Sequence, residues 1–416
     1  MSFNISDYLQ VFRSRRIAVI LLLGFSSGLP LALTGGTVQA WMATAGVDLR
    51  TIGMVLLAGL PYTVKFLWSP FMDRFVPPWF GRRRGWIIIT QLGLMTGIAF
   101  MAFGTPASDP WFLAGLALIT AFCSASQDIV VDAYRTDVLR EQERGIGAAV
   151  FVMGYRIAML VSGALALILS DLIGWRNTYL LMAGLMSVGM IAAIFGPEPE
   201  KAVVPPRDLQ EAVWGPLKDL LTRNKAVYFL LLIVLYKLCD AYAGAMLTPF
   251  LIRGIGFTPT DVGTINKLLG LVSLIVGALF GGALMVRLGL YRSLMVFGIL
   301  QAVSILSFMV LAWTGKNYGM LAFAVALENL TGGMGTAAFV SLLMTICNQR
   351  FSATQYALLS SLAALGRTFI APTSGYIVSY VGWANYFLIA TLTALPGLWL
   401  LWRLRFEISG LKNGDS

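Results

Sequence analysis

The sequence predicts an all-α membrane protein with twelve transmembrane helices in two pseudo-symmetric six-helix bundles. Three observations predict it: an apolar composition, twelve apolar runs of bilayer length, and an internal repeat of about 210 residues. Of the 416 residues, 58% are hydrophobic and 12% are charged, and the mean hydropathy is +0.78. A soluble domain carries about a quarter charged residues, so this composition excludes an ordinary soluble protein.

The twelve apolar runs each approach the ~20 residues that cross a bilayer. They cover residues 17–42, 51–72, 86–104, 111–136, 146–170, 175–195, 226–250, 260–286, 293–313, 318–347, 354–379 and 384–402. The first run is long enough to span, so we expect no cleaved signal. A polar stretch rich in Pro, Glu, Lys and Arg separates the sixth run from the seventh. We therefore predict an N-terminal bundle at 1–196, a cytoplasmic linker at 197–225, a C-terminal bundle at 226–403 and a cytoplasmic tail at 404–416.

The distribution of Lys and Arg between loops predicts the orientation. With the N-terminus inside, most loop cations fall on the cytoplasmic side, and the opposite side holds only Arg50, Arg176, Arg253 and Lys316. Cytoplasmic loops of membrane proteins carry such an excess of Lys and Arg. We therefore expect both termini in the cytoplasm. The net charge of +10 reflects this topology, and no nucleic-acid partner is expected.

The two halves of the chain repeat each other. GVDLRTIG (46–53) parallels GFTPTDVG (256–263), GWRNTYL (174–180) parallels GWANYFL (382–388), and Arg156 parallels Arg367. Two parallel six-helix halves joined by a central cytoplasmic linker describe the major facilitator fold.

The loop after the second run carries an acid among basic residues. Its sequence, MDRFVPPWFGRRRG, resembles the facilitator loop motif of Asp-Arg followed by Gly and Arg or Lys. We predict a conformational latch in which Asp73 pairs with arginines and helix ends across the interface between the halves and holds one state closed. The candidate latch residues are Asp73, Arg74, Arg82 and Arg83. The alternative is a basic loop that only obeys the positive-inside rule.

Nine ionisable side chains fall inside the apolar runs. Each costs roughly 2.5–3.5 kcal/mol at the bilayer centre on insertion scales. We therefore expect them to line a hydrated cavity, mostly paired or hydrogen-bonded, rather than to face lipid. They are Lys65, Asp128, Asp132, Arg156, Lys237, Asp240, Lys267, Glu328 and Arg367.

Asp128 and Asp132 are four residues apart and so share one face of a helix. Like charges at this spacing repel, and a low dielectric strengthens the repulsion. A carboxylate in this setting can take and release a proton as it is alternately hydrated, and the chain contains no histidine for that role. We predict that the two aspartates are the proton-coupling element. The alternative is an ion-pair staple with Arg156 and Lys65.

The remaining intramembrane polar residues are predicted to bind substrate. Lys237 and Asp240, three residues apart, suit a local ion pair. The symmetry-related Arg156 and Arg367 suit an anionic ligand, because guanidinium groups bind carboxylates bidentately, or else they neutralise the intramembrane acids. The predicted substrate-binding residues are Lys65, Tyr62, Gln127, Arg156, Lys237, Asp240, Asn266, Lys267, Glu328, Asn329 and Arg367.

Glycine and proline inside apolar runs predict broken helices. They occur in GLPLALTGG (28–36), in TGGMG (331–335) and at Ala371-Pro372. Interrupted spans free backbone polar groups and mark binding sites in transporters. GALFG (277–281) matches GxxxG, for which close helix packing is the expected explanation.

Longer stretches resemble one family. FSSGLPLALTGGTVQAWM (25–42), GLPYTVKFLWSPFMDR (59–74), GRRRGW (81–86) and SASQDIVVDAYRTD (124–137) resemble the AmpG family of muropeptide permeases from Gram-negative inner membranes. The resemblance implies proton-driven import of N-acetylglucosaminyl-1,6-anhydro-N-acetylmuramyl peptides from periplasm to cytosol. Such import feeds peptidoglycan recycling and induction of AmpC β-lactamase. The family's QDxxxD stretch supports the importance of Asp128 and Asp132.

The implied partners are the anhydro-muropeptide, protons and the lipid bilayer. We expect a monomer that uses the proton gradient as its energy source and needs no cofactor. The alternative is a facilitator for another organic anion such as acetyl-CoA. A passive channel would conduct without a proton gradient. A membrane enzyme acting on wall precursors is not expected, because the chain has no histidine and its three cysteines lack metal-ligand spacing.

Overall fold

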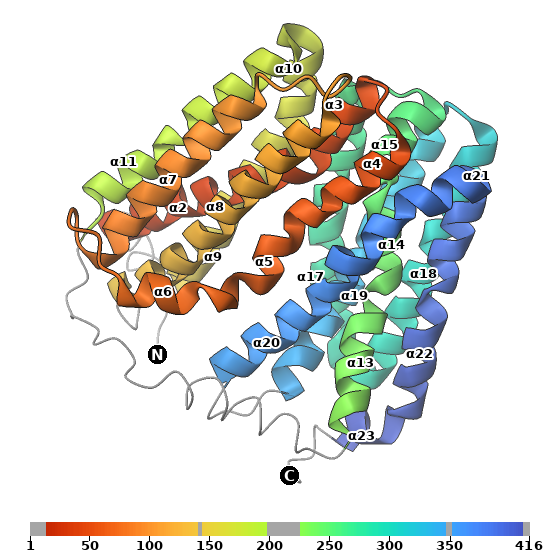
Figure 1. Ribbon diagram of the computed structural model, residues 1–416. Helices are drawn as coiled ribbons and strands as arrows, with labels where there is room; N and C mark the ends of the chain where they lie inside the picture. Colours follow the sequence, from red (N-terminus) through yellow and green to blue (C-terminus); the bar gives the residue numbers. More distant parts are fainter. Residues whose placement is uncertain (1–13, 140–143, 198–224, 347–351, 411–416) are drawn as a thin grey trace. The chain divides into compact units, whose positions relative to one another are not determined.

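The computed structural model describes residues 14–139, 144–197, 225–346 and 352–410 (Figure 1). Within these ranges, every regular element is a helix. This agrees with the predicted all-α class, since a helix satisfies its own backbone hydrogen bonds in lipid. Contacts divide the chain into a first unit, residues 1–46 and 58–207, and a second unit, residues 47–57 and 208–416. The predicted boundaries at 196, 225 and 403 stay predictions.

The first unit begins with one long apolar stretch, Arg15–Thr44, that contains α2, η1 and α3. In the unit, α2 packs on α8, α9 and α11, and α7 packs on α8, α10 and α11. Its helices are α2 (Arg15–Ala32), η1 (Leu33–Thr37), α3 (Val38–Thr44), α5 (Leu60–Val64), η3 (Lys65–Leu67), α6 (Ser69–Arg74), α7 (Arg82–Met101), α8 (Pro110–Val138), α9 (Arg144–Met159), η5 (Leu160–Leu165), α10 (Ala166–Leu185) and α11 (Ser187–Phe195).

The second unit is organised around α18 and α19, which pack on one another and on α17. Its helices are α4 (Leu49–Met54), α13 (Ala226–Tyr236), α14 (Leu238–Ala245), α15 (Leu247–Pro249), η6 (Phe250–Ile255), α16 (Pro259–Asp261), η7 (Val262–Leu269), α17 (Gly270–Leu288), α18 (Leu290–Thr314), α19 (Tyr318–Ile346), α20 (Ser352–Leu365), η9 (Gly366–Ile370), η10 (Ala371–Thr373), α21 (Ser374–Leu392), α22 (Ala394–Arg403) and α23 (Arg405–Gly410). The short helix η2 (Val55–Gly59) straddles the division between the units.

The described residues contain nine helices that are long and apolar enough to cross a membrane. Two of them, Val150–Phe195 and Leu358–Arg403, have 46 residues each and cover two predicted runs apiece. Both change direction at a glycine, Gly174 with φ +80° and Gly382 with φ +77°. Glycine alone adopts this backbone without strain, and these two positions correspond in the repeat. The count of twelve spans and the side of the termini stay predictions.

Two of the three predicted helix breaks are confirmed. In the first run, η1 contains Gly35 with φ −115° and ψ −107°, outside the helical region. In the eleventh run, the π-helix η9 leads into the 3₁₀-helix η10 at Ala371-Pro372. The break at TGGMG (331–335) is wrong, since α19 continues through it. The glycines there make room for neighbours: a Cβ added to Gly335 would lie 2.8 Å from Gln301 Oε1.

Glycines also bring helix backbones into contact within each unit. A Cβ on Gly277 would overlap the Leu330 carbonyl oxygen, and one on Gly281 would lie 2.6 Å from Met334 Cα. The close packing expected of GALFG is therefore confirmed between α17 and α19. In the first unit, Gly24 and Gly154 likewise allow close packing of α2 on α9. Cβ atoms added to these two glycines would overlap backbone oxygens of the other helix.

Residues 47–57 belong to the second unit because α4 packs on α21 and η10. A Cβ on Gly53 would lie 2.9 Å from the Pro372 carbonyl oxygen, and Arg50 Nε donates to Ser379 Oγ at 3.4 Å. The Asp48 side chain accepts from the backbone N–H of Arg50 and begins α4. The first part of the second predicted run, residues 51–57, thus belongs to the second unit.

The Gly277→Ala substitution should destabilise the protein, because the added methyl group overlaps the backbone of α19. We expect a loss of about 2 kcal/mol, typical of overpacking, read as a lower unfolding temperature of the purified protein in detergent. Gly282→Ala is the matched control on the same helix, since nothing lies within 4 Å of its added Cβ. Equal unfolding temperatures for the two variants would contradict the assigned contact.

Candidate functional site

The first unit places Asp128 among polar groups inside apolar helices. Asp128 lies on α8, Lys65 begins η3, and Asp132 lies one turn along α8. Lys65 attracts the Asp128 carboxylate and Asp132 repels it. None of the ion pairs formed by the described residues includes Asp128. Its charge therefore has a nearby cation but no direct ionic bond.

Three hydroxyl groups surround this acid. Ser27 of α2 faces the Asp128 carboxylate, and the Tyr62 hydroxyl of α5 is directed at Ser124 of α8. All three hydroxyl oxygens are buried, and none completes a hydrogen bond within the described chain. Buried polar atoms normally have partners. This arrangement therefore suits a site whose hydroxyls bond to a bound polar molecule.

Asp132 lies in a different environment from Asp128. Its side chain is half exposed, and its Oδ1 lies 3.2 Å from Arg135 Nη2. Arg135 in turn lies over the Phe151 ring, with Cζ 4.5 Å from the ring centroid. The two aspartates share a helix but differ in exposure and in ion pairing.

The ion-pair staple has no direct support at Asp128. Arg156 Nη1 lies 3.9 Å from Met159 Sδ on its own helical segment. Within the described residues, no ion pair joins Arg156 or Lys65 to Asp128. Of these two cations, Lys65 acts on Asp128 through space, which leaves the carboxylate open to a proton or a ligand.

The second unit holds a lysine at a helix break. Lys237 separates α13 from α14 and has the non-helical angles φ −93° and ψ 1°. Its Nζ donates to Asp240 Oδ2 at 3.3 Å and to Thr336 Oγ1 of α19 at 3.0 Å. The local Lys237–Asp240 pair predicted from the sequence is therefore confirmed.

Glu328 on α19 forms the other part of this cluster. Asn329 Nδ2 donates to Glu328 Oε2 at 2.8 Å, and Lys267 Nζ donates to Thr248 Oγ1 at 3.5 Å. Asp240 repels the Glu328 carboxylate, whereas Lys237 and Lys267 attract it. The cluster therefore combines two acids and two lysines, so its charges largely balance within one unit.

The remaining predicted site residues lie elsewhere in their units. Asn266 is buried on η7 and Arg367 is exposed on η9. Gln127 is fully buried and donates from Nε2 to Ser26 Oγ at 3.0 Å. Substrate binding by these three residues stays a prediction.

One candidate latch residue, Arg83, forms an ion pair that the latch prediction did not include. Arg83 Nε donates to Asp137 Oδ2 at 2.9 Å, and both side chains are largely buried. The pair joins the start of α7 to the end of α8 within the first unit. The side chains of Asp73, Arg74 and Arg82 lie outside the described part of the structure, so the latch stays a prediction.

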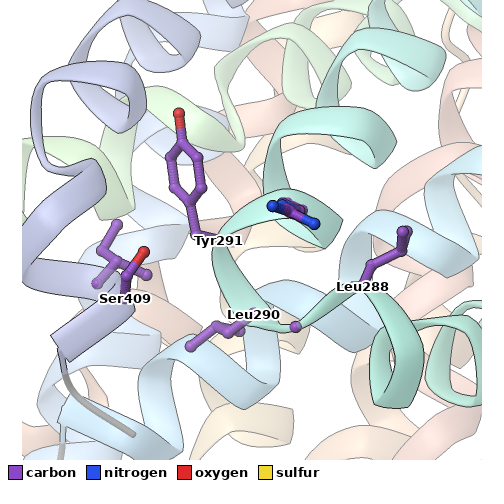
Figure 2. A pocket seen from close by; sticks show the side chains of 7 residues that line it. Leu288, Leu290, Tyr291 and Ser409 are labelled. Atoms are coloured by element: carbon purple, nitrogen blue, oxygen red, sulfur yellow. The ribbon is translucent and has the colours of Figure 1, made fainter.

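A hollow of about 170 Å³ lies at one end of the second unit. The side chains of Leu288, Leu290, Tyr291 and Ser409 surround it (Figure 2). It contains none of the intramembrane charges, so it is separate from the clusters around Asp128 and Lys237.

Comparisons with known proteins decide the family. The model of the Major Facilitator Superfamily matches residues 20–369 and 238–415. The chain is also 54% identical over 412 residues to the anhydromuropeptide permease of Escherichia coli K12, covering 99% of this chain and 84% of the relative. This chain belongs to the major facilitator superfamily and to the anhydromuropeptide permease family. It is a transporter and not an enzyme.

Solved facilitator structures share its fold. A bacterial homologue of the human lysosomal transporter Spinster aligns with a TM-score of 0.70 at 13% identity, covering 96% of this chain and 97% of that one. A D-xylose–proton symporter aligns with a TM-score of 0.71 at 13% identity, covering 93% of this chain and 97% of that one. At such identity the likeness shows the facilitator fold alone.

Sequence reasoning missed the partners that complete these permease clusters. Thr336 and Thr248 are bonded to the two lysines, and Ser27 faces Asp128. A hydroxyl in an apolar helix is too common to single out. The repeat carries a usable signal, because Ser27 lies 210 residues before Lys237, and Thr336 lies 208 residues after Asp128.

The Lys237→Met substitution should destabilise the protein, because it leaves Asp240 beside Glu328 with one cation fewer. We expect a loss of about 1 kcal/mol, discounted because the Asp240 side chain is partly exposed and screened. Adding Asp240→Asn should restore part of the loss. The measurement is thermal unfolding in detergent, and Lys316→Met, at an exposed position, is the control. A double variant less stable than Lys237→Met would contradict the pairing.

Proposed function

We propose that this chain imports N-acetylglucosaminyl-1,6-anhydro-N-acetylmuramyl peptides from periplasm to cytosol by proton-coupled alternating access. The carrying observation is 54% identity over 99% of the chain to a relative named anhydromuropeptide permease. It would act as a monomer in a Gram-negative inner membrane, with the proton gradient as its energy source and no cofactor. The imported fragments would serve peptidoglycan recycling and induction of AmpC β-lactamase.

Asp128 is the proposed proton carrier. Its carboxylate lies among apolar helices without a direct ion pair and beside buried hydroxyls. An acid in this setting changes its charge at lower cost than one fixed by an arginine. Asp132, paired with Arg135 and half exposed, would pass protons between solvent and Asp128.

The two polar clusters match different parts of the ligand. The disaccharide offers hydroxyl and amide groups, which the hydroxyls of Ser27, Tyr62 and Ser124 would bond. The stem peptide carries carboxylates, for which Lys237 and Lys267 would exchange their present partners. Because these lysines are already balanced by Asp240 and Glu328, the cluster suits a ligand with charges of both signs.

Uptake should depend on the gradient through Asp128. We expect proteoliposomes containing the protein to accumulate labelled anhydro-muropeptide when the outside is more acidic, because inward proton flow drives symport. Asp128→Asn should lower gradient-driven uptake ~100-fold, the scale of losing a positioned proton-transfer group. It should retain exchange of labelled for unlabelled substrate, which needs no net proton movement.

Asp109→Asn is the matched control. Asp109 caps the same helix at its exposed end by accepting from the Phe112 N–H, and asparagine caps a helix equally well. Gradient-independent accumulation by the unaltered protein would contradict symport. Full driven uptake by Asp128→Asn would remove Asp128 from coupling, and uptake of acetyl-CoA in place of the muropeptide would overturn the substrate.

A further inference from the structure

A buried glutamine occupies the same place in each unit, outside the clusters described above. Gln91 lies on α7 and Gln301 on α18, and the two are 210 residues apart. Their exposed fractions are 0% and 2%. An amide is costly to bury among apolar helices unless its hydrogen bonds are made. Two such amides at corresponding places therefore need an explanation beyond packing.

Gln91 connects three helices of the first unit. The Gln91 Nε2 donates to Ser26 Oγ of α2, which also accepts from Gln127 Nε2 of α8 at 3.0 Å. Gly189 of α11 leaves room for this contact, since an added Cβ would overlap both Gln91 Nε2 and Ser26 Oγ. The serine hydroxyl is thus held between two amides from different helices.

The residues held by Gln91 stand directly before the site residues in sequence. Ser26 precedes Ser27, and Gln127 precedes Asp128. Ser27 faces the Asp128 carboxylate. A shift of α2 against α8 at Ser26 would therefore move Ser27 relative to Asp128 by a similar amount.

In the second unit the corresponding glutamine, Gln301, packs near the residues that precede the charged cluster. A Cβ added to Gly335 of α19 would lie 2.8 Å from Gln301 Oε1 and 4.0 Å from the Tyr236 hydroxyl. Tyr236 precedes Lys237, and Gly335 precedes Thr336. Lys237 Nζ donates to Thr336 Oγ1 at 3.0 Å. Gln301 therefore lies next to the residues that directly precede Lys237 and Thr336 in the chain.

Packing alone does not require an amide at these places. Gln91 Oε1, Gln127 Oε1 and Gln301 Nε2 are buried without a partner in the described chain. Methionine has nearly the same length and would fill the space without an unpaired polar atom. The unpaired amide atoms therefore lower the stability of the protein. A role in positioning the neighbouring site residues would explain why glutamine is present at these places.

We propose that Gln91 and Gln301 are positioning residues, one for each cluster. Gln91 sets the separation of Ser27 and Asp128 and so tunes proton coupling. Gln301 sets the separation of Lys237 and Thr336 and so tunes substrate affinity. The proposal rests on the proposed function and adds a division of labour between the units.

The groups that face Asp128 come from several elements. Lys65 of η3 and Asp132 of α8 act on it through their charges, and Tyr62 of α5 interacts with it and with Tyr155 of α9. The packed face of α2 contributes Ser26 and Ser27, which are uncharged. A substitution at Gln91 alters none of the charged groups, so a changed pH profile would report the geometry around Asp128.

The test is uptake of labelled anhydro-muropeptide into proteoliposomes at a series of external pH values. For Gln91→Met we expect the midpoint of the pH profile to move by about one unit, with maximal rate about 5-fold lower and KM nearly unchanged. For Gln301→Met we expect KM to rise about 5-fold, with the pH midpoint unchanged. If the glutamines had only a structural role, both variants would yield less folded protein. The pH midpoint would then not change for Gln91→Met, and KM would not change for Gln301→Met.

Matched controls lie on the same two helices. Thr90→Val and Ser293→Ala remove buried hydroxyls that bond to carbonyls three or four residues earlier in the chain, so both should behave like the unaltered protein. Ser26→Ala removes the Gln91 partner at little change in volume and should shift the pH midpoint as Gln91→Met does. If Gln91→Met fails to fold, the Ser26→Ala variant still tests the proposal.

The outcomes separate this inference from the proposed function. If the unaltered protein shows gradient-driven uptake and Asp128→Asn loses it, the proposed function stands. If Ser26→Ala and Gln91→Met then keep the unaltered pH profile, and Gln301→Met keeps its KM, the inference is overturned alone. If the unaltered protein shows no gradient-driven uptake, the proposed coupling fails and the inference fails with it.

Discussion

A bilayer core contains almost no water, so every charge carried within it must find its partner in the protein. A single unpaired charge costs roughly 2.5–3.5 kcal/mol there on insertion scales, a large fraction of a typical folding free energy. Lys237 meets this constraint by bonding to Asp240 and Thr336, and Asp132 meets it by pairing with Arg135. Asp128 differs from these two residues, because Lys65 acts on it only through space.

The two units meet the constraint with opposite chemistry at corresponding places. An acid on α8 faces a serine on α2 in the first unit, whereas a lysine between α13 and α14 bonds to a threonine on α19 in the second. The two units thus share the same arrangement of helices, but the charged residue lies on a different helix of the repeat in each unit. Under the proposed function, the first unit would respond to protons and the second to a charged ligand.

Close helix contacts at glycines hold helices of each unit tightly together. At the α2–α9 contact in the first unit and the α17–α19 contact in the second, glycines allow the two helix backbones to touch directly. The π-helical turns η1, η5 and η7 directly adjoin α2, α9 and α17 in the chain. A π-turn interrupts the regular hydrogen-bond ladder and often occurs at functional sites. Each unit therefore combines stiff helix pairs with local irregular turns close to its polar residues.

The sequence by itself determined the all-helical membrane class, the intramembrane acids and the pairing of Lys237 with Asp240. These depend on composition and on spacing within one helix, which local pattern encodes. Only the tertiary structure decided that TGGMG stays helical, that residues 47–57 pack in the second unit, and that Arg83 pairs with Asp137, 54 residues away. It also decided that Gln127 bonds to Ser26 and that Asp132 is half exposed. The physical reason is that these features arise from contacts between distant helices, whose rotation and separation no short stretch of sequence specifies.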